Sequence, residues 1–399
     1  MFPGRNLVMK RLSNAKATVL AVLLALGSAA AGIAPAFAGA PNLYFYTVGV
    51  DGYPTDVMFD GQSIWVAIQN TGGGTVEKVT TTGEVVSSTP VGDAPIEMAY
   101  DGANVWVTNY SSSTLSIVGQ NGEVLKTIFL PLPSHPEGIL FDGKYIWIAN
   151  NGANVNTVSK FDAASMTFVA TYPVGNAPDG LAFDGTYIWV TNSYSNNVMK
   201  LDRDSGEVVR AYPTGTYPLS IISVGADMWI GNGAIDAGLP PLAAASVTEL
   251  RVNGGVDLGT FAAGNAVRGL AYDGSSVWAC NSLSNTVTRI RASDGAPLGS
   301  FPTGMAPRGI AFDGVRMWIA NSGDSFLTIV TPDDAPIDVT PGKEVFAFFL
   351  PGVFIDPKLL APVAGNGAAS EAAITSNSPR VSPGVAALGG ILDALLDNN

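Results

Sequence analysis

Cysteine and histidine are almost absent from this sequence: Cys280 and His135 are the only examples among 399 residues. A single cysteine excludes an intramolecular disulfide, so packing and hydrogen bonds must hold the fold together. Charged residues are also scarce at 13%, whereas apolar residues reach 47%, which is enough for a sizeable core. The 46 glycines and 26 prolines are too many for a helical protein and indicate many turns between short strands.

Basic residues are few after position 38. The first 38 positions hold four of the 20 Lys and Arg residues and none of the 33 Asp and Glu residues, which leaves 16 basic and 33 acidic residues in the rest of the chain. Proteins bind nucleic acids and anionic membrane surfaces through basic patches. The composition therefore argues against either of them as the main partner.

The N-terminus has the three parts of a secretory signal peptide. An apolar core at 19–27 follows a basic start, and Ala36-Phe37-Ala38 provides a small-residue cleavage motif. The apolar core is short for a spanning helix, which makes an uncleaved membrane anchor the weaker alternative. We predict cleavage after Ala38 and a secreted or periplasmic protein with no transmembrane segment in the mature chain. The basic residues of the start are Arg5, Lys10, Arg11 and Lys16.

Seven tryptophans recur at a nearly constant spacing, and they are all the tryptophans in the chain. The successive intervals are 41, 41, 42, 40, 49 and 40 residues, and a proline stands eleven positions before every tryptophan except Trp278, where Val267 takes its place. A repeat of about forty residues is typical of β-propellers. The tryptophans are Trp65, Trp106, Trp147, Trp189, Trp229, Trp278 and Trp318.

Each repeat contains four candidate strands. In the fourth copy they lie at 178–183, 187–191, 197–201 and 207–212, and Asp184-Gly185 forms the turn between the first two. Both faces of such a sheet are apolar, so one blade cannot bury its own surface and the copies must stack into a ring. The sequence therefore predicts an all-β fold, a seven-bladed β-propeller of four-stranded blades.

The segment after the signal peptide looks like the end of a repeat. Tyr44 to Gly49 matches fourth-strand endings such as Thr171 to Gly175, and the last repeat loses the pattern at Pro332 after its third strand. We therefore predict that this N-terminal strand completes the last blade and closes the ring. The expected domains are the signal peptide at 1–38, the propeller at 43–333 and a C-terminal tail at 334–399.

Two segments depart from the repeat. The long interval between Trp229 and Trp278 comes from an insertion at 233–245 that is rich in Gly, Ala and Pro and reads as a surface loop. The apolar and linker-like tail has no run of spanning length. Two interpretations of the tail stay open: a segment that packs over the propeller or is partly disordered, or a segment that attaches to a partner.

The stretches from Phe183 to Asn192 and from Asn281 to Val287 resemble bacterial YVTN/NHL-type propeller repeats. Within these, the streptogramin lyase (virginiamycin B lyase-like) group is similar over roughly Tyr44 to Pro332. The resemblance implies a propeller, and for the lyases a divalent metal with catalytic histidine and glutamate near the axis. The sequence departs from this pattern because its only histidine, His135, lies in a loop before Pro136 and the later repeats have none.

Charged residues that differ between copies follow the repeat prolines, where the innermost strands should begin near the axis. The first four copies offer carboxylates and the sixth and seventh offer arginines. Two interpretations stay open: solvated or mutually paired charges at the rim, or a polarised pocket for a metal or a polar ligand. The residues are Asp56, Glu97, Glu137, Asp179, Arg268 and Arg308.

An asparagine stands three residues after every tryptophan except the first. A residue that recurs in this way usually serves the repeat, here by Asx-type hydrogen bonds that cap a loop. Because these positions should share a face with the charges, Asn150 and Asn192 are also candidates for ligand binding. The full set is Asn109, Asn150, Asn192, Asn232, Asn281 and Asn321.

Two functional hypotheses follow. The first is a secreted, non-catalytic binding or scaffold protein that uses its loop face or its tail for an extracellular or envelope ligand or protein, with no cofactor. The second is a metal-dependent lyase or lactone hydrolase, in which carboxylates hold Ca²⁺ or Mg²⁺, since a site of oxygen ligands suits these metals. The scarcity of histidine favours the first. The predicted metal ligands of the second are Asp56, Glu97, Glu137 and Asp179.

Overall fold

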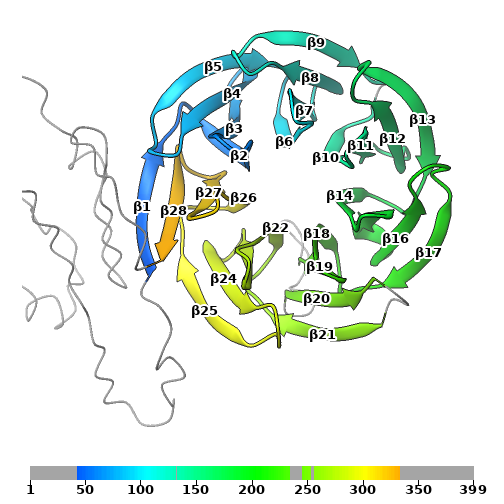
Figure 1. Ribbon diagram of the computed structural model, residues 1–399, viewed down its shortest axis with the longest axis vertical. Coiled ribbons are helices and arrows are strands. Elements are labelled where there is room, and N and C mark those ends of the chain that lie inside the picture. The colour runs from blue at the N-terminus through cyan, green and yellow to red at the C-terminus, as the bar shows by residue number, and fades with distance from the viewer. Residues whose placement is uncertain (1–42, 132, 234–244, 253–255, 333–399) are drawn as a thin grey trace, which may run out of the picture. The chain divides into compact units, whose positions relative to one another are not determined.

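The computed structural model describes residues 43–131, 133–233, 245–252 and 256–332. The predicted signal peptide, nearly all of the predicted insertion loop and the predicted C-terminal tail lie outside these residues. In the described part, seven four-stranded antiparallel sheets form a ring around a central axis (Figure 1). This confirms the predicted all-β, seven-bladed propeller. No helix of the described part is long and apolar enough to cross a bilayer.

Each blade runs outward from the axis in chain order. The innermost strands are β2 (Tyr53–Phe59), β6 (Pro95–Tyr100), β10 (Pro136–Phe141), β14 (Pro178–Phe183), β18 (Pro218–Val224), β22 (Val267–Tyr272) and β26 (Pro307–Phe312). The second strands, which carry the tryptophans, are β3 (Ser63–Asn70), β7 (Val105–Asn109), β11 (Tyr145–Asn150), β15 (Tyr187–Asn192), β19 (Asp227–Asn232), β23 (Ser276–Asn281) and β27 (Met317–Asn321).

The outer half of each blade holds the third and fourth strands. The third strands are β4 (Gly73–Thr80), β8 (Thr114–Val118), β12 (Thr157–Asp162), β16 (Asn197–Asp202), β20 (Ser246–Arg251), β24 (Thr286–Arg291) and β28 (Phe326–Pro332). The fourth strands of the first six blades are β5 (Val85–Val91), β9 (Val124–Phe129), β13 (Thr167–Pro173), β17 (Val208–Pro213), β21 (Asp257–Ala262) and β25 (Pro297–Pro302).

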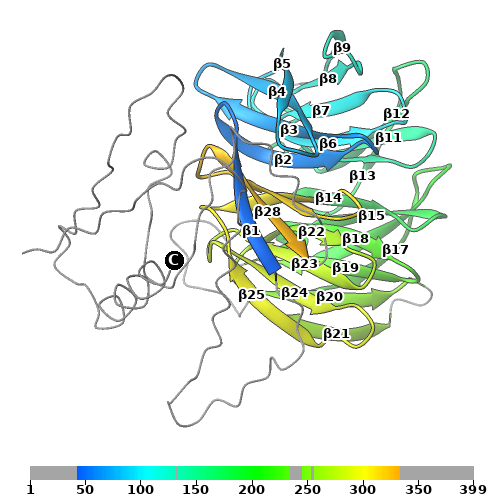
Figure 2. The same cartoon turned by 60° about the vertical axis from the view of Figure 1, so that its left-hand side comes forward.

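The seventh sheet combines strands from both ends of the described chain. Its order is β1-β28-β27-β26, where β1 (Leu43–Gly49) lies on the outside (Figures 1 and 2). β1 is antiparallel to β28, with Tyr46 opposite Ile329. The side chains of Tyr46, Ile329 and Ile64 of the first blade belong to one buried cluster. This cluster therefore joins the seventh blade to the first.

The tryptophans are buried between neighbouring blades. Trp106 of the second blade is fully buried in one cluster with Ile146 and Ile148 of the third blade. Each blade thus covers the apolar face of the next, which is why the repeats are stable only as a stack. Truncating such a tryptophan to alanine is expected to cost about 3–5 kcal/mol.

The aspartate of the first turn explains why the turn and the tryptophan keep a fixed offset. In the fourth blade, Asp184 accepts the indole N–H of Trp189 at 2.7 Å and the backbone N–H of Tyr187 at 2.7 Å. Gly185 in the same turn has a φ of 91°, a value that favours glycine. In the fifth blade Val224 takes the place of this aspartate. The same Asp–Trp bond is present in Asp60–Trp65, Asp101–Trp106, Asp142–Trp147, Asp273–Trp278 and Asp313–Trp318.

Candidate functional site

The backbone at the start of the innermost strands turns sharply. Residues directly before the repeat prolines, such as His135 with a φ of 44° and Ala177 with a φ of 53°, lie in the left-handed region. After each proline the register with the second strand shifts, as between Pro136 and Ile139. Bulges of this kind redirect side chains and are frequent near functional sites. The residues predicted as site residues, Asn150 and Asn192 apart, all occupy these irregular positions.

Two glycines let the inner strands approach one another closely. A Cβ on Gly138 would lie 2.0 Å from the carbonyl oxygen of Asp179, and one on Gly269 would lie 2.0 Å from that of Arg308. Only glycine fits such contacts, so in these blades the charged side chain stands at the preceding position, as Glu137 and Arg268 do. We call the face where inner strands begin and second strands end the loop face, and we name the six charged residues there the axial charge cluster.

One ion pair crosses the ring. Arg308 of the seventh blade donates from Nη2 to Oε1 of Glu137 in the third blade at 2.9 Å. The other carboxylate oxygen of Glu137 accepts a hydrogen bond from the side-chain amide of Asn151 at 2.8 Å. The side chains of Glu137 and Arg308 are 10% and 20% exposed. Charges at remote positions in the sequence therefore pair at the axis.

Asp56 and Glu97 connect neighbouring blades through the backbone. A carboxylate oxygen of Asp56 accepts the N–H of Met98 in the second blade at 2.9 Å. In the same way, Glu97 accepts the N–H of Ile139 in the third blade at 3.3 Å. Both carboxylates are half-buried and serve the contacts between inner strands.

Asp179 differs from the other carboxylates of the cluster. It is 7% exposed, and among the described residues its side chain has no hydrogen-bond partner. It interacts electrostatically with Glu137 of the third blade and with Arg268 and Arg308 of the sixth and seventh. A side chain that interacts with groups on three other blades must face the axis. Arg268 is half-buried beside it.

Burial dominates the electrostatics of the cluster. It raises the pKa of Asp56 from 3.8 to about 7, against the opposing effect of the Met98 N–H. It also raises the pKa of Glu97 and of Asp179 well above their ordinary values, and the carboxylates of Asp56 and Glu137, respectively, add to this. Burial alone would lower the pKa of Arg308, but the surrounding carboxylates, Glu137 first, raise it.

The candidate asparagines lie inside the blades. Asn150 is 3% exposed, and its amide nitrogen donates to the hydroxyls of Thr157 and Ser159 on the third strand. Asn192 is fully buried and donates to Asn197 on the third strand at 2.9 Å. These bonds join two strands and do not cap a loop, because the side chain points along the sheet toward the next strand. Neither amide nitrogen is therefore directed at a ligand on the loop face.

The cluster does not fit a ready-made site for a divalent metal. Of the four predicted ligands, Asp56 and Glu97 bind backbone N–H groups and Glu137 binds an arginine. In the part of the chain that the structure describes, no group of three or more His, Cys, Asp and Glu side chains is arranged to hold a metal ion. Coordination of Ca²⁺ or Mg²⁺ by Asp56, Glu97, Glu137 and Asp179 would require these bonds to break.

Aromatic side chains on the loop face were not identified by sequence reasoning. Tyr110 of the second blade and His135 are in edge contact, with ring centroids 4.6 Å apart. Tyr194 and Tyr217 form a second pair at 5.4 Å, and Tyr194 is 66% exposed. The residues at these loop positions differ between the repeats. That variation at otherwise regular positions is the one signal in the sequence that could have identified them.

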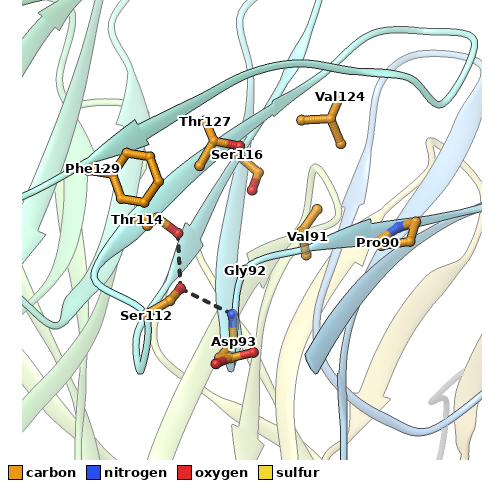
Figure 3. Close-up of a pocket in the computed structure, with 10 residues that line it drawn as sticks. All are labelled: Pro90, Val91, Gly92, Asp93, Ser112, Thr114, Ser116, Val124, Thr127 and Phe129. Carbon is orange, nitrogen blue, oxygen red and sulfur yellow. Dashed lines mark hydrogen bonds between the residues drawn. The ribbon is translucent and has the colours of Figure 1, made fainter. Parts of the chain in front are cut away.

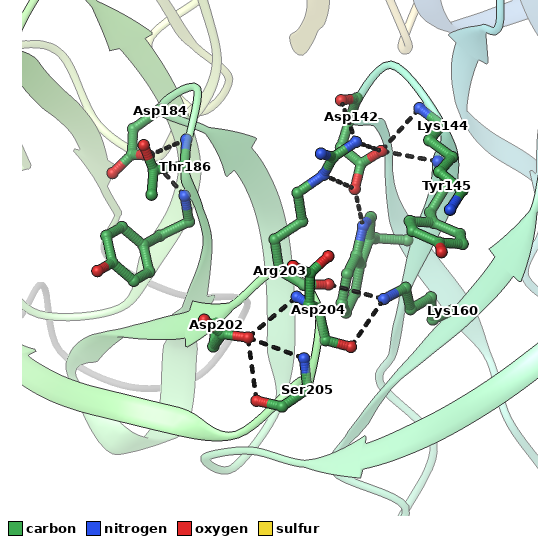
Figure 4. A network of polar contacts seen from close by, with 12 residues as sticks. Asp142, Lys144, Tyr145, Lys160, Asp184, Thr186, Asp202, Arg203, Asp204 and Ser205 are labelled. Carbon is green, nitrogen blue, oxygen red and sulfur yellow. Dashed lines mark hydrogen bonds and ion pairs between the residues drawn. The ribbon is translucent and has the colours of Figure 1, made fainter.

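Charges on the opposite face hold neighbouring blades together. Arg203 of the fourth blade donates from Nε to Asp142 of the third at 2.9 Å, and Lys160 donates to the carbonyl oxygen of Arg203 at 2.7 Å (Figure 4). Asp142 also accepts the indole N–H of Trp147. The arginine holds the pKa of Asp142 below its ordinary value despite burial, which alone would raise it. The side chains of Arg203, Asp142 and Lys160 are therefore already bonded to neighbouring residues of the fold.

A hollow of about 430 Å³ lies between the outer strands of the first and second blades, where β5, β8 and β9 line it (Figure 3). Its hydroxyls already bind one another and the backbone: Ser112 contacts Thr114 at 2.9 Å and accepts the N–H of Asp93 at 3.1 Å. The exposed ring of Phe129 forms its outer wall. The axial charge cluster, where the Asp179 carboxylate has no hydrogen-bond partner within the described part of the chain, is the stronger candidate.

Comparison with known proteins identifies the fold. No protein-family model and no curated protein matches this chain. Among solved structures, virginiamycin B lyase from Staphylococcus aureus is 18% identical with a TM-score of 0.60 over 73% of this chain and 99% of that chain. Hydrazine synthase of Kuenenia stuttgartiensis is 19% identical with a TM-score of 0.62, over 76% and 100%. The WD40 domain of Neurospora crassa Pan2 is 11% identical with a TM-score of 0.63, over 76% and 99%.

These similarities place the chain among propellers like virginiamycin B lyase in fold. The same lyase is also known as a catalytically inactive histidine-to-alanine variant with quinupristin. At such low identity the similarity extends to the fold alone, because one fold carries many unrelated activities. The function must therefore be argued from the site.

Proposed function

We propose that this protein is an exported, non-catalytic binding protein that holds a polar ligand at the axial charge cluster of the loop face. The observation that carries the proposal is the carboxylate of Asp179, which is 7% exposed and has no hydrogen-bond partner in the described part of the chain. Burial raises the pKa of this carboxyl group well above its ordinary value, so holding it in its charged form lowers the stability of the native state. Binding sites commonly contain side chains that lower stability in this way.

The surroundings of Asp179 strengthen this interpretation. Glu137 raises its pKa further, whereas Arg268 and Arg308 act in the opposite direction, and Arg308 is already paired with Glu137. The carboxylate is thus directed at the axis with unused hydrogen-bonding capacity. A ligand that donates hydrogen bonds there would satisfy it.

The scarcity of acid–base groups supports a binding role. General acid–base catalysis most often uses histidine, and the only histidine of this sequence, His135, is in contact with the ring of Tyr110. The inactive variant of virginiamycin B lyase is altered at a histidine, whereas this chain has one histidine in total. The alternative, a metal-dependent lyase or lactone hydrolase, would have to assemble its metal ligands from carboxylates that now bind other groups.

The test compares two variants that remove one carboxylate each. Asp179→Asn should leave the free energy of unfolding unchanged or increase it, because it removes a buried, unpartnered carboxylate, and it should abolish stabilisation by ligands. Asp93→Asn, at an exposed position on the loop face, should change neither. Chemical denaturation and thermal shift with a panel of amines, acids and sugars give both readouts. A clear loss of stability in Asp179→Asn without ligand would assign this residue a structural role and contradict the proposal.

The metal-dependent alternative has its own test. A cation at about 100 times its dissociation constant should add about 2.7 kcal/mol to the stability of the native state. Thermal melts in Ca²⁺, in Mg²⁺ and in chelator therefore measure it directly. Identical melts under the three conditions would remove the metal-dependent enzyme.

A further inference from the structure

The hollow between the first and second blades is separate from the axial charge cluster, because the outer strands β5, β8 and β9 line it. Its volume of about 430 Å³ lies in the range of about 300–1,000 Å³ that is common for small-molecule sites. Near one end the two blades are joined, where the hydroxyl of Thr89 donates to the carbonyl oxygen of Gly122 at 2.6 Å. Gly92 and Asp93 border the hollow at the loop face. Two blades thus build this space together.

Phe129 at the wall of the hollow differs from the equivalent residues of the other blades. It lies opposite Thr114, the first residue of the third strand, and its ring is 82% exposed. At the same register the five other blades with a described fourth strand of their own have proline or alanine. These residues are Pro90, Pro173, Pro213, Ala262 and Pro302. The repeat therefore does not need an aromatic side chain here, and an exposed ring beside a hollow is typical of a binding surface.

Four hydroxyl groups form the floor of the hollow. Figure 3 shows them in a row beside the ring of Phe129, from Thr127 through Ser116 and Thr114 to Ser112. Ser116 and Thr127 are opposite each other on β8 and β9, and the hydroxyls of Ser112 and Thr114 are 2.9 Å apart. An aromatic face and a line of polar groups thus border the same space.

The hydroxyls of the floor are held in place and still have hydrogen-bonding capacity. The side-chain amide of Asn109 donates to Thr114 at 3.1 Å and to Ser116 at 3.0 Å, and the N–H of Asp93 donates to Ser112 at 3.1 Å. A hydroxyl can donate one hydrogen bond and accept two, so these bonds do not use all of its capacity. Groups that are ordered before a ligand arrives lose little entropy on binding.

The lining of the hollow favours one class of ligand. Within the described part of the chain it includes one charged residue, the acidic Asp93, and no basic residue, so nothing there attracts an anion. A purely apolar ligand would cover the hydroxyls without bonding to them, which is unfavourable. A pyranose sugar has a face of C–H groups and a rim of hydroxyls that both donate and accept. Its two surfaces match the ring of Phe129 and the row of hydroxyls.

We propose that this hollow is a carbohydrate-binding site, in which the C–H face of a pyranose ring stacks on Phe129 and the sugar hydroxyls bond to the hydroxyl row. Stacking removes apolar surface of both partners from water, and the hydroxyl row fixes the orientation of the sugar. Because Phe129 lies on an exposed edge strand, an oligosaccharide can extend beyond the hollow. The inference goes beyond the proposed function and does not depend on the axial charge cluster.

Calorimetric titration of the folded protein tests the class of ligand. The probes are the neutral oligosaccharides cellotetraose, maltotetraose and chitotetraose at up to millimolar concentration. Mannitol is the matched control, because it has the hydroxyls of a hexose but no ring with a C–H face. The peptide acetyl-Thr-Val-Thr-Val-Thr amide tests the alternative, in which a peptide strand adds to the edge of β9. We expect at least one oligosaccharide to bind, and neither mannitol nor the peptide.

Variants assign the binding to the hollow. Phe129→Ala should weaken oligosaccharide binding about tenfold or more, because it removes the stacking surface. It should leave the free energy of unfolding unchanged, since Ala262 has the same register in the fifth blade. Thr127→Val removes one exposed hydroxyl and should weaken binding about three- to tenfold. Tyr194→Ala is the control: it removes a 66% exposed ring in the fourth blade and should leave the affinity unchanged.

Several results would overturn the inference. They are no binding of any oligosaccharide, equal binding of mannitol, tighter binding of the peptide, or oligosaccharide binding that is unchanged in both Phe129→Ala and Thr127→Val. Asp179→Asn separates this inference from the proposed function, because oligosaccharide binding at the hollow should persist in that variant. Binding that is lost in Asp179→Asn but kept in Phe129→Ala would assign the sugar to the axial charge cluster, which contradicts this inference and supports the proposed function.

Discussion

The ion pair between Arg308 and Glu137 gives the sharpest test of how the ring is held at its axis. Arg308→Met keeps the length of the side chain but removes the positive charge that lies 2.9 Å from Glu137. The variant leaves four carboxylates around the axis with Arg268 as the remaining cation of the cluster. We expect the native state to lose stability, because the largely buried Glu137 then loses its paired cation and keeps only the hydrogen bond from Asn151.

The size of this effect follows from the burial of the pair. Removing one partner of a buried ion pair typically costs about 3–5 kcal/mol. The arginine is 20% exposed, so we expect a loss near the lower limit, about 3 kcal/mol. For a domain of this size, each kcal/mol lowers the melting temperature by about 2 °C or slightly more, which predicts a decrease of roughly 6 °C.

Denaturant and thermal unfolding of four proteins measure the effect: the wild type, Arg308→Met, Glu137→Gln and the double variant. The double variant should lose less stability than the two single variants together, since it no longer contains an unpaired charge. Arg291→Met serves as the control, because the pair of Arg291 with Asp294 has both side chains about half exposed and is worth less than about 1 kcal/mol. If Arg308→Met loses no more stability than Arg291→Met, the cross-ring pair does not hold the propeller and our reasoning is wrong.

Three further predictions concern the fold. Deleting Leu43–Val50 should lower the melting temperature far more than deleting Thr375–Asn399, because only the first deletion removes the outer strand of the seventh sheet; equal losses in paired melts would contradict a closing role for this strand. Asp184→Asn should cost about 1–3 kcal/mol in denaturant unfolding, because the amide cannot accept from both Trp189 and the turn, and an unchanged midpoint would refute this. Stability should fall as the pH rises from about 4 to 7, because the pKa of Asp56 is raised from 3.8 to about 7 in the native state and the unfolded chain therefore loses its proton first. At about 1.4 kcal/mol per pH unit this residue contributes at most about 4 kcal/mol, and Asp56→Asn should flatten the slope; stability that rises over this range would contradict the assignment.

The spacing of the tryptophans was sufficient to predict the blades. Each blade is a local unit of about forty residues, and its turn signal and its buried tryptophan lie five positions apart and are joined by one hydrogen bond, as in Asp184 and Trp189. Because such a contact is local and occurs in nearly every blade, the residues that form it recur at a regular spacing in the sequence. The asparagines also recur at a regular spacing, but the sequence did not show their partners. The side chain of Asn150 donates to the third strand of its blade and does not cap the loop after the second strand.

The sequence by itself determined the number of blades, the strands within each blade and the set of charged residues at the axis, because these depend on periodicity and on position after the repeat proline. Only the tertiary structure decided which charges are paired. Arg308 and Glu137 are 171 positions apart, and they meet because closure of the ring brings the third and seventh blades to a common axis. The same closure leaves Asp179 buried at the axis with no hydrogen-bond partner among the described residues, and no local pattern encodes a contact whose geometry depends on the complete ring.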